Sequence, residues 1–176
     1  HLLTMTAGLD WNEESLPYAD PRNDGSIMEA SYDWVKYVLD KPMAEEPGKA
    51  FNYNGGATQM LAHIFRVATG KDLEEYGAKY LFKPLGIHRY YWKRAPSGLV
   101  DAQGGLYLEK KDLAKIFYLY LKAGKWQDKQ LIRTDYVRQS VTPFVRIDHN
   151  LAYGYKWWLN SYGKKSTEVA WRGSGF

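Results

Sequence analysis

EPGKAFNYNGG, residues 46–56, leads directly into the most regular helical pattern of this 176-residue chain. Pro47-Gly48 predicts a turn. From residue 57 to residue 69 apolar side chains recur every three or four positions, and Gly70 follows as the glycine that commonly closes a helix. We therefore expect a helix over residues 57–69, entered through a tight backbone turn at Gly55-Gly56.

Tyr53 is the candidate functional residue of this stretch. It precedes a helix N-terminus, where unpaired N–H groups and the helix dipole favour anions. Such a position predicts a phenol that titrates below its usual pKa of roughly 10. On position alone, however, the favoured interpretation is an aromatic side chain that packs under a loop.

Composition excludes several classes of protein. The chain is long enough for one domain with a core, and it has no cysteine, which excludes disulfides, cysteine-bound zinc and thiol nucleophiles. The net charge of +4 is spread without a basic block, which argues against a dedicated nucleic-acid binder. No apolar run approaches the roughly 18 residues of a membrane span, and no signal peptide is visible. Both ends lie inside apparent elements, so we expect an internal segment of a longer protein.

The other patterns predict mostly helices, followed by a pair of strands. Ser31 and Asp72 are expected to cap two of the helices, and residues 10–25 predict a loop. In the helix that opens at residue 111 or 112 and runs to residue 121, the expected inward side chains are Leu113, Ile116, Phe117, Tyr120 and Leu121. Of the other predicted helices, one ends at residue 5, one covers residues 32–39, one begins at residue 72 and one covers residues 134–140. The predicted strands cover residues 87–94, 153–159 and 167–171.

Six segments resemble, in the same order, motifs of the serine β-lactamase-like hydrolases. That group includes class C β-lactamases, DD-peptidases, family VIII esterases and 6-aminohexanoate-dimer hydrolases. Residues 1–9, HLLTMTAGL, resemble the H-L-L-T-H-T-S-G-L segment of the group. The other matches are Pro47-Gly48 to Tyr53, ATG at 68–70, LFKPLGI at 81–87, GGLY at 104–107 with DLAK at 112–115, and YGYKWW at 153–158. Each match alone is weak, but together they span nearly the whole chain.

The resemblance implies an α+β fold that is incomplete at both ends. Residues 1–145 would form the helical region, and residues 146–176 would form antiparallel strands that return to a sheet. The family acylates the serine of an S-x-x-K motif, which we expect to precede residue 1 in the intact protein. Ser161 and Lys164 match the same letters, but they lie in a predicted hairpin turn.

The family's second catalytic group, the tyrosine of Y-x-N or Y-x-S, maps onto Tyr53. Its phenolate would accept the serine proton and return it to the leaving group. The third position of this motif is Gly55, so a hydrogen bond to lysine or to a substrate amide is lost there. Asn54, the adjacent residue, is a candidate replacement.

The family's third group, a K-T-G or H-x-G triad, maps onto Gly173-Ser174-Gly175. Its basic residue is missing, and Arg172 lies one position earlier. The backbone N–H of Phe176 would then contribute to the oxyanion hole. Tyr107 and one tryptophan of the 157–158 pair, for which we take Trp157, are expected to line the cleft.

The resemblance implies acyl transfer to serine and hydrolysis of an ester, amide or β-lactam. The glycines at positions 55 and 173 favour an ester or a small amide. The alternative is a non-catalytic relative that binds peptidoglycan-like or peptide ligands in the same cleft. No metal or organic cofactor is implied. The expected partner is a small-molecule substrate, and we expect neither nucleic-acid binding nor a membrane span. The resemblance suggests a periplasmic or secreted location.

Overall fold

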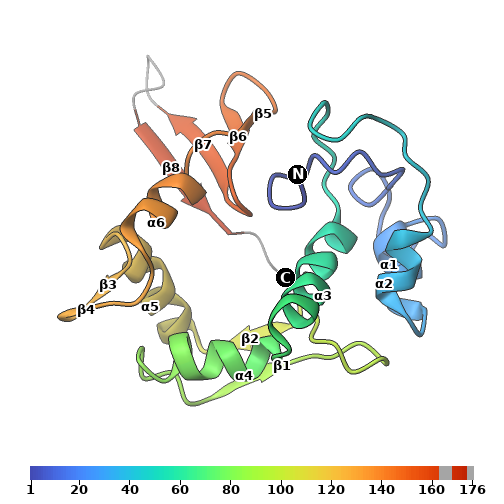
Figure 1. Cartoon of the computed structure of the whole chain (residues 1–176). Helices are drawn as coiled ribbons and strands as arrows, with labels where there is room; N and C mark the ends of the chain where they lie inside the picture. Colours follow the sequence, from blue (N-terminus) through green and yellow to red (C-terminus); the bar gives the residue numbers. More distant parts are fainter. Residues whose placement is uncertain (163–167, 174–176) are drawn as a thin grey trace.

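The computed structural model describes residues 1–162 and 168–173 of the chain (Figure 1). It has the predicted α+β composition, with helices distributed over residues 24–140 and a four-stranded sheet formed by residues 145–172. The helices are α1 (Asp24–Ala30), α2 (Trp34–Leu39), α3 (Gly55–Thr69), α4 (Leu73–Gly77), the π-helix η1 (Ala78–Phe82), α5 (Lys110–Leu121) and α6 (Thr134–Ser140). The strands are β1 (Tyr90–Trp92), β2 (Leu106–Leu108), β3 (Lys125–Trp126), β4 (Lys129–Gln130), β5 (Val145–Arg146), β6 (Leu151–Tyr153), β7 (Trp158–Tyr162) and β8 (Glu168–Arg172).

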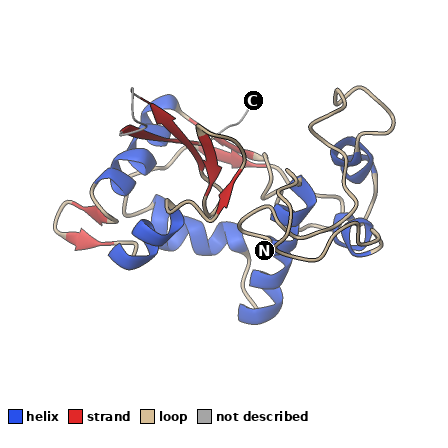
Figure 2. Cartoon of the chain, turned by 90° about the horizontal axis from the view of Figure 1, so that it is seen from above, coloured by secondary structure: helices blue, strands red, loops and turns tan. Residues whose placement is uncertain are grey.

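The strands form three antiparallel sheets. Strands β1 and β2 make one hairpin, β3 and β4 make another, and β5-β6-β7-β8 form a four-stranded sheet in that order. Figures 1 and 2 show the four-stranded sheet at one end of the molecule, away from α1 and α2. In the described residues, no helix has both the length and the apolar character needed to cross a bilayer.

Helix α3 confirms the helix predicted after Tyr53, and it begins two residues earlier than expected. Asn54 is its N-cap, because its Oδ1 accepts a hydrogen bond of 2.7 Å from the Ala57 amide. Gly70 ends the helix with a left-handed φ of 67°. The sequence therefore sets both ends of α3 through local hydrogen bonds and backbone geometry.

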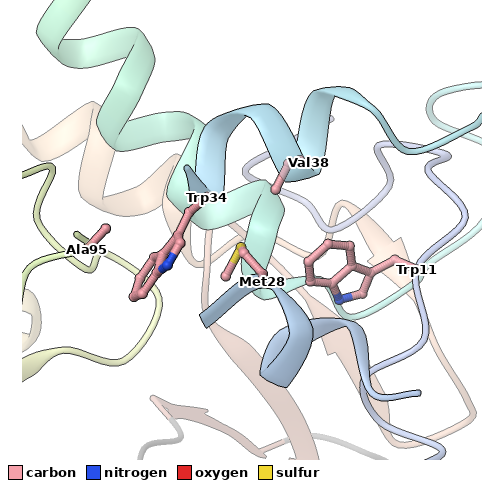
Figure 3. Packing of buried hydrophobic residues seen from close by; sticks show 5 residues of the cluster. All are labelled: Trp11, Met28, Trp34, Val38 and Ala95. Carbon is pink, nitrogen blue, oxygen red and sulfur yellow. The ribbon is translucent and has the colours of Figure 1, made fainter. Parts of the chain in front are cut away.

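One hydrophobic cluster joins α1 and α2 to the loops that carry Trp11 and Ala95, and Met60 of α3 packs against it (Figure 3). Each of its five side chains is at most 4 % exposed, and burying one such large apolar side chain contributes about 1.5–3 kcal/mol. At Gly56 a Cβ would lie only 2.6 Å from Val38 Cγ2, so the helices touch where α3 has no side chain. The cluster consists of Trp11, Met28, Trp34, Val38 and Ala95.

A second cluster joins the four-stranded sheet to the entry of α3. Trp158 and Tyr153, on neighbouring strands, pack with Met5 and with Ala57 in the first turn of α3. Phe51 and Tyr53 pack against this cluster from the segment that precedes α3. The sheet thus fixes the position of Tyr53.

Three predictions for the N-terminal region are wrong. Residues 1–5 form a turn rather than a helix end, because Met5 has a left-handed φ of 57° that a right-handed helix does not contain. Helix α1 lies partly inside the predicted loop; its seven residues are too few to show a clear apolar period. Ser31 ends α1 instead of starting the next helix, and Asp33 caps α2 by accepting a hydrogen bond from the Lys36 amide.

Two further predictions, for the strand over residues 153–159 and for the buried face of α5, need correction. The expected strand over 153–159 is two strands joined by a tight turn, in which Gly154 N donates to Trp157 O at 2.9 Å. In α5 the most deeply buried side chain is Leu119, which is fully buried, while Leu113 and Leu121 are 46 % and 69 % exposed. Neighbouring elements, rather than the apolar period alone, decide which face of α5 is covered.

Candidate active site

Tyr53 lies at the wall of a cavity of about 460 Å³. Its half-buried ring is stacked on Trp158, with the ring centres 5.8 Å apart and the planes at 18°. Trp158 is itself held by the rings of Phe51 and Tyr153, at 5.7 and 4.9 Å. The sheet and the segment before α3 together fix the direction of the phenol.

Glu13 is the second residue that defines this cavity, and its side chain is almost fully buried. Its Oε2 accepts hydrogen bonds of 2.7 Å from the Gly55 amide, at the start of α3, and from Trp11 Nε1. Its Oε1 accepts a 2.9 Å hydrogen bond from the Tyr18 hydroxyl. A carboxylate with several donors at a helix N-terminus is stabilised by charge-assisted hydrogen bonds and by the helix dipole.

Burial, together with the charge of Glu13, explains why the pKa of Tyr53 departs from its usual value in the direction opposite to our expectation. Burial raises the pKa of Tyr53, and the nearby negative charges of Glu13 and Glu14 raise it further. The anion-favouring position at the start of α3 is occupied by Glu13, which leaves the phenol next to a carboxylate. The expected lowering of the Tyr53 pKa is therefore wrong for this structure.

Another part of the cavity wall is the segment that leads into β2, and α3 holds it in place. Gln59, fully buried in α3, donates to Val100 O at 2.9 Å and accepts from Ala102 N at 3.0 Å. Asp101 then accepts hydrogen bonds from the backbone amides of Gln103 and Gly104. This segment is fixed to the same helix that starts at the Tyr53 motif.

Two charged side chains complete this wall. Lys93 Nζ lies 2.7 Å from Glu29 Oε2 and 3.6 Å from Asp101 Oδ2. Gln103 Nε2 donates a 2.8 Å hydrogen bond to the other oxygen of Glu29. The cavity is therefore lined mainly by polar side chains, and Tyr53 is one of its few aromatic residues.

The structure brings together part of the predicted site. Tyr107 lines the same cavity as Tyr53, although its side chain is 59 % exposed. Gly55 is not among the lining residues, but its amide donates to Glu13, which is. Asn54 is buried as the α3 cap and is not among the residues that line the cavity.

The structure places the two tryptophans of the 157–158 pair differently from the sequence prediction, which chose Trp157 to line the cleft. Trp157 packs against the rings of Phe117 and Tyr120, whereas Trp158 stacks on Tyr53. Which of the two residues faces Tyr53 depends on where β7 begins, and the turn at 154–157 sets that start.

Arg172, which precedes the predicted triad, lies close to the stacked rings of Tyr53 and Trp158. Arg172 is paired with Trp158 across β7 and β8, and its guanidinium lies 5.7 Å from the centre of the Trp158 ring. Gly173 directly follows β8. Ser174, Gly175 and Phe176 lie outside the described residues, so their assigned roles remain predictions.

Sequence reasoning missed Lys156 as well as Glu13. The backbone of Lys156 has a left-handed φ of 62°, and its Nζ donates to Met5 Sδ at 3.2 Å. Burial lowers the pKa of Lys156 to about 7, although the charge of Glu13 opposes that shift. A lysine after Tyr-Gly-Tyr gives no signal in the sequence that it is partly buried, and only the turn between β6 and β7 places it there.

Comparison with known proteins agrees with this architecture. The family model described as Beta-lactamase matches residues 1–176. A protein assigned as a 6-aminohexanoate-dimer hydrolase from Bacillus anthracis superposes with a TM-score of 0.75 at 19 % identity, over 97 % of this chain and 50 % of that one. An octameric penicillin-binding protein homologue from Pyrococcus abyssi gives 0.66 at 21 % identity (90 % and 42 %), and a D-amino acid amidase from Ochrobactrum anthropi SV3 gives 0.62 at 17 % identity (97 % and 56 %).

These structures define a class, the proteins with a serine β-lactamase fold. The chain spans about half the length of the solved structures that it matches, and the search of curated proteins finds no match. Because the family model covers all 176 residues, the chain belongs to the β-lactamase family.

Proposed function

We propose that the intact protein is a serine hydrolase in which Tyr53 transfers the proton. One observation carries the proposal: the Tyr53 phenol is fixed by Trp158 at the wall of a polar cavity, directly before a helix N-terminus. The S-x-x-K serine that the family resemblance implies would attack the substrate carbonyl in this cavity.

The proposed reaction has two halves. The serine hydroxyl loses its proton to the Tyr53 phenolate as the serine oxygen bonds to the carbonyl carbon, and Tyr53 then returns the proton to the leaving group. In the second half, a water molecule attacks the acyl-enzyme with the same proton transfers and releases the carboxylic acid. Because burial and Glu13 favour the protonated phenol, the phenolate needs a neighbouring cation. We propose that the S-x-x-K lysine, which the family resemblance implies as the group that eases deprotonation of the serine, also supplies this positive charge.

The substrate we propose is an ester or a small amide. The names of two structural neighbours, the 6-aminohexanoate-dimer hydrolase and the D-amino acid amidase, describe proteins that act on amides. The absence of a side chain at Gly55 weakens the case for a β-lactam. We also propose that the triad at 173–175 lines the cleft with Arg172 beside it, and that the Phe176 amide stabilises the oxyanion.

The test is Tyr53→Phe in the full-length protein. This change keeps the ring and its stacking on Trp158 but removes the oxygen that carries the proton, so turnover of a p-nitrophenyl ester should fall by roughly 10²–10⁴-fold. The melting temperature should remain near that of the wild type. Tyr91→Phe is the matched control, because Tyr91 is 64 % exposed and does not line the cavity.

Two outcomes would contradict the proposal. Near wild-type turnover of Tyr53→Phe would assign Tyr53 a packing role only. A full-length wild-type protein that binds peptides without any turnover would instead support the non-catalytic relative.

A further inference from the structure

Position 55 lacks a side chain, and another residue fills the space. A Cβ built on Gly55 would lie 2.1 Å from Gln103 Oε1, far inside van der Waals contact. The same Cβ would lie 3.1 Å from Glu13 Oε2. The Gln103 carboxamide therefore occupies the volume into which a side chain at position 55 would project.

The hydrogen-bond network orients this carboxamide. Gln103 Nε2 donates to Glu29 Oε1 at 2.8 Å, and Glu29 is also paired with Lys93. A carboxylate only accepts hydrogen bonds, so the NH₂ group of Gln103 must face Glu29 and its carbonyl oxygen must face Gly55. Oε1 is thus an acceptor beside Gly55 of the Tyr53 motif, and it belongs to a residue that lines the cavity.

The backbone of Gln103 is also fixed in place. Its amide donates to Asp101 Oδ1 at 3.1 Å, and the preceding residue, Ala102, is bonded to Gln59 of α3. The side chain therefore starts from a segment anchored to the helix that carries Gly55. Anchoring of this kind preorganises a binding group.

We infer that Gln103 supplies the polar side chain that position 55 lacks, and that its Oε1 accepts a hydrogen bond from a substrate N–H beside the scissile carbonyl. The inference rests on the proposed function and adds the substrate class. The favoured substrates carry an N–H donor on the acyl side of the bond that is cleaved. Asn54 cannot serve in this way with its Oδ1, which caps α3.

The test compares two esters with the same leaving group in the full-length protein. They are the p-nitrophenyl esters of N-acetylglycine, which has the N–H, and of its N-methyl analogue, which does not. Gln103→Ala should lower kcat/KM for the N–H ester by about 3- to 10-fold, the range for one lost uncharged hydrogen bond. The N-methyl ester should change less than about twofold, and Gln139→Ala, a control on the exposed face of α6, should affect neither.

A second pair of variants tests the shared space without any substrate. Gly55→Ser should lower the melting temperature when Gln103 is present, because the new Cβ and Oε1 would occupy the same position. Adding Gln103→Ala to Gly55→Ser should recover most of that loss. Additive effects of the two changes would show that the side chains do not compete for this volume, and would overturn the inference.

The outcomes separate this inference from the proposed function. Equal effects of Gln103→Ala on both esters, or no effect on either, in an enzyme that turns over would refute the role of Gln103 alone. A wild-type protein that hydrolyses neither ester would refute the proposed function, and with it the substrate-binding role of Gln103.

Discussion

Replacing Lys156 by methionine should stabilise the folded protein near neutral pH. In the folded state burial lowers the pKa of Lys156 from 10.5 to about 7. One pKa unit corresponds to about 1.4 kcal/mol, so protonated Lys156 costs the folded state up to about 5 kcal/mol. We expect a gain of about 2–4 kcal/mol in the free energy of unfolding, because a lysine side chain can shift its charged end toward water and relieve part of this cost.

The sign of the pH dependence follows from the same shift. Between about pH 7 and pH 10.5 the unfolded state binds the Lys156 proton more tightly than the folded state, so the stability of the wild type rises with pH in this window. The methionine variant lacks this contribution. Its advantage should therefore be nearly complete at and below pH 7 and should shrink toward zero near pH 10.5.

The assay is urea unfolding of both proteins at about pH 7 and about pH 10. Strain from the φ of 62° is the same for both side chains and cancels in the comparison. Lys49→Met, at an exposed lysine, is the matched control and should change stability little at either pH. A Lys156→Met variant no more stable than the wild type at pH 7, or a difference that does not depend on pH, would refute the assignment of Lys156 as a poorly solvated, partly buried ammonium.

Two further changes test how the Tyr53 motif is held. Glu13→Gln removes the negative charge that faces the Gly55 amide and Tyr53. The free energy of unfolding should fall by about 1–3 kcal/mol. The pKa of Tyr53, followed by carbon-13 NMR of labelled tyrosine, should also fall. An unchanged Tyr53 titration would exclude Glu13 as a cause of the raised pKa. Gly56→Ala should lower the free energy of unfolding, measured in urea, by about 1–3 kcal/mol, because the new Cβ would lie 2.6 Å from Val38 Cγ2. An unfolding midpoint equal to that of the wild type would show that α2 can move aside.

The elements that could be predicted from sequence are those whose signals are local. Helix α3 has a polar cap, a regular apolar period and a closing glycine within 17 residues, and the structure confirms it. Asp72 likewise caps α4, as expected. Helix α1 and the turn between β6 and β7 were missed or misplaced because short segments take their conformation from contacts with distant parts of the chain. The division of the chain at residues 145 and 146 stays a prediction.

By itself, the sequence determined the family, through six short motifs in a fixed order, and it identified Tyr53 as the residue to examine. Both depend on residue identity and spacing, which are written in the chain. Only the tertiary structure decided the electrostatic surroundings of Tyr53, because Glu13 lies 40 residues earlier and reaches the start of α3 only after folding. It also decided that Gln103, rather than Asn54, fills the space beside Gly55, since van der Waals exclusion acts between atoms that are close in space, whatever their separation in sequence.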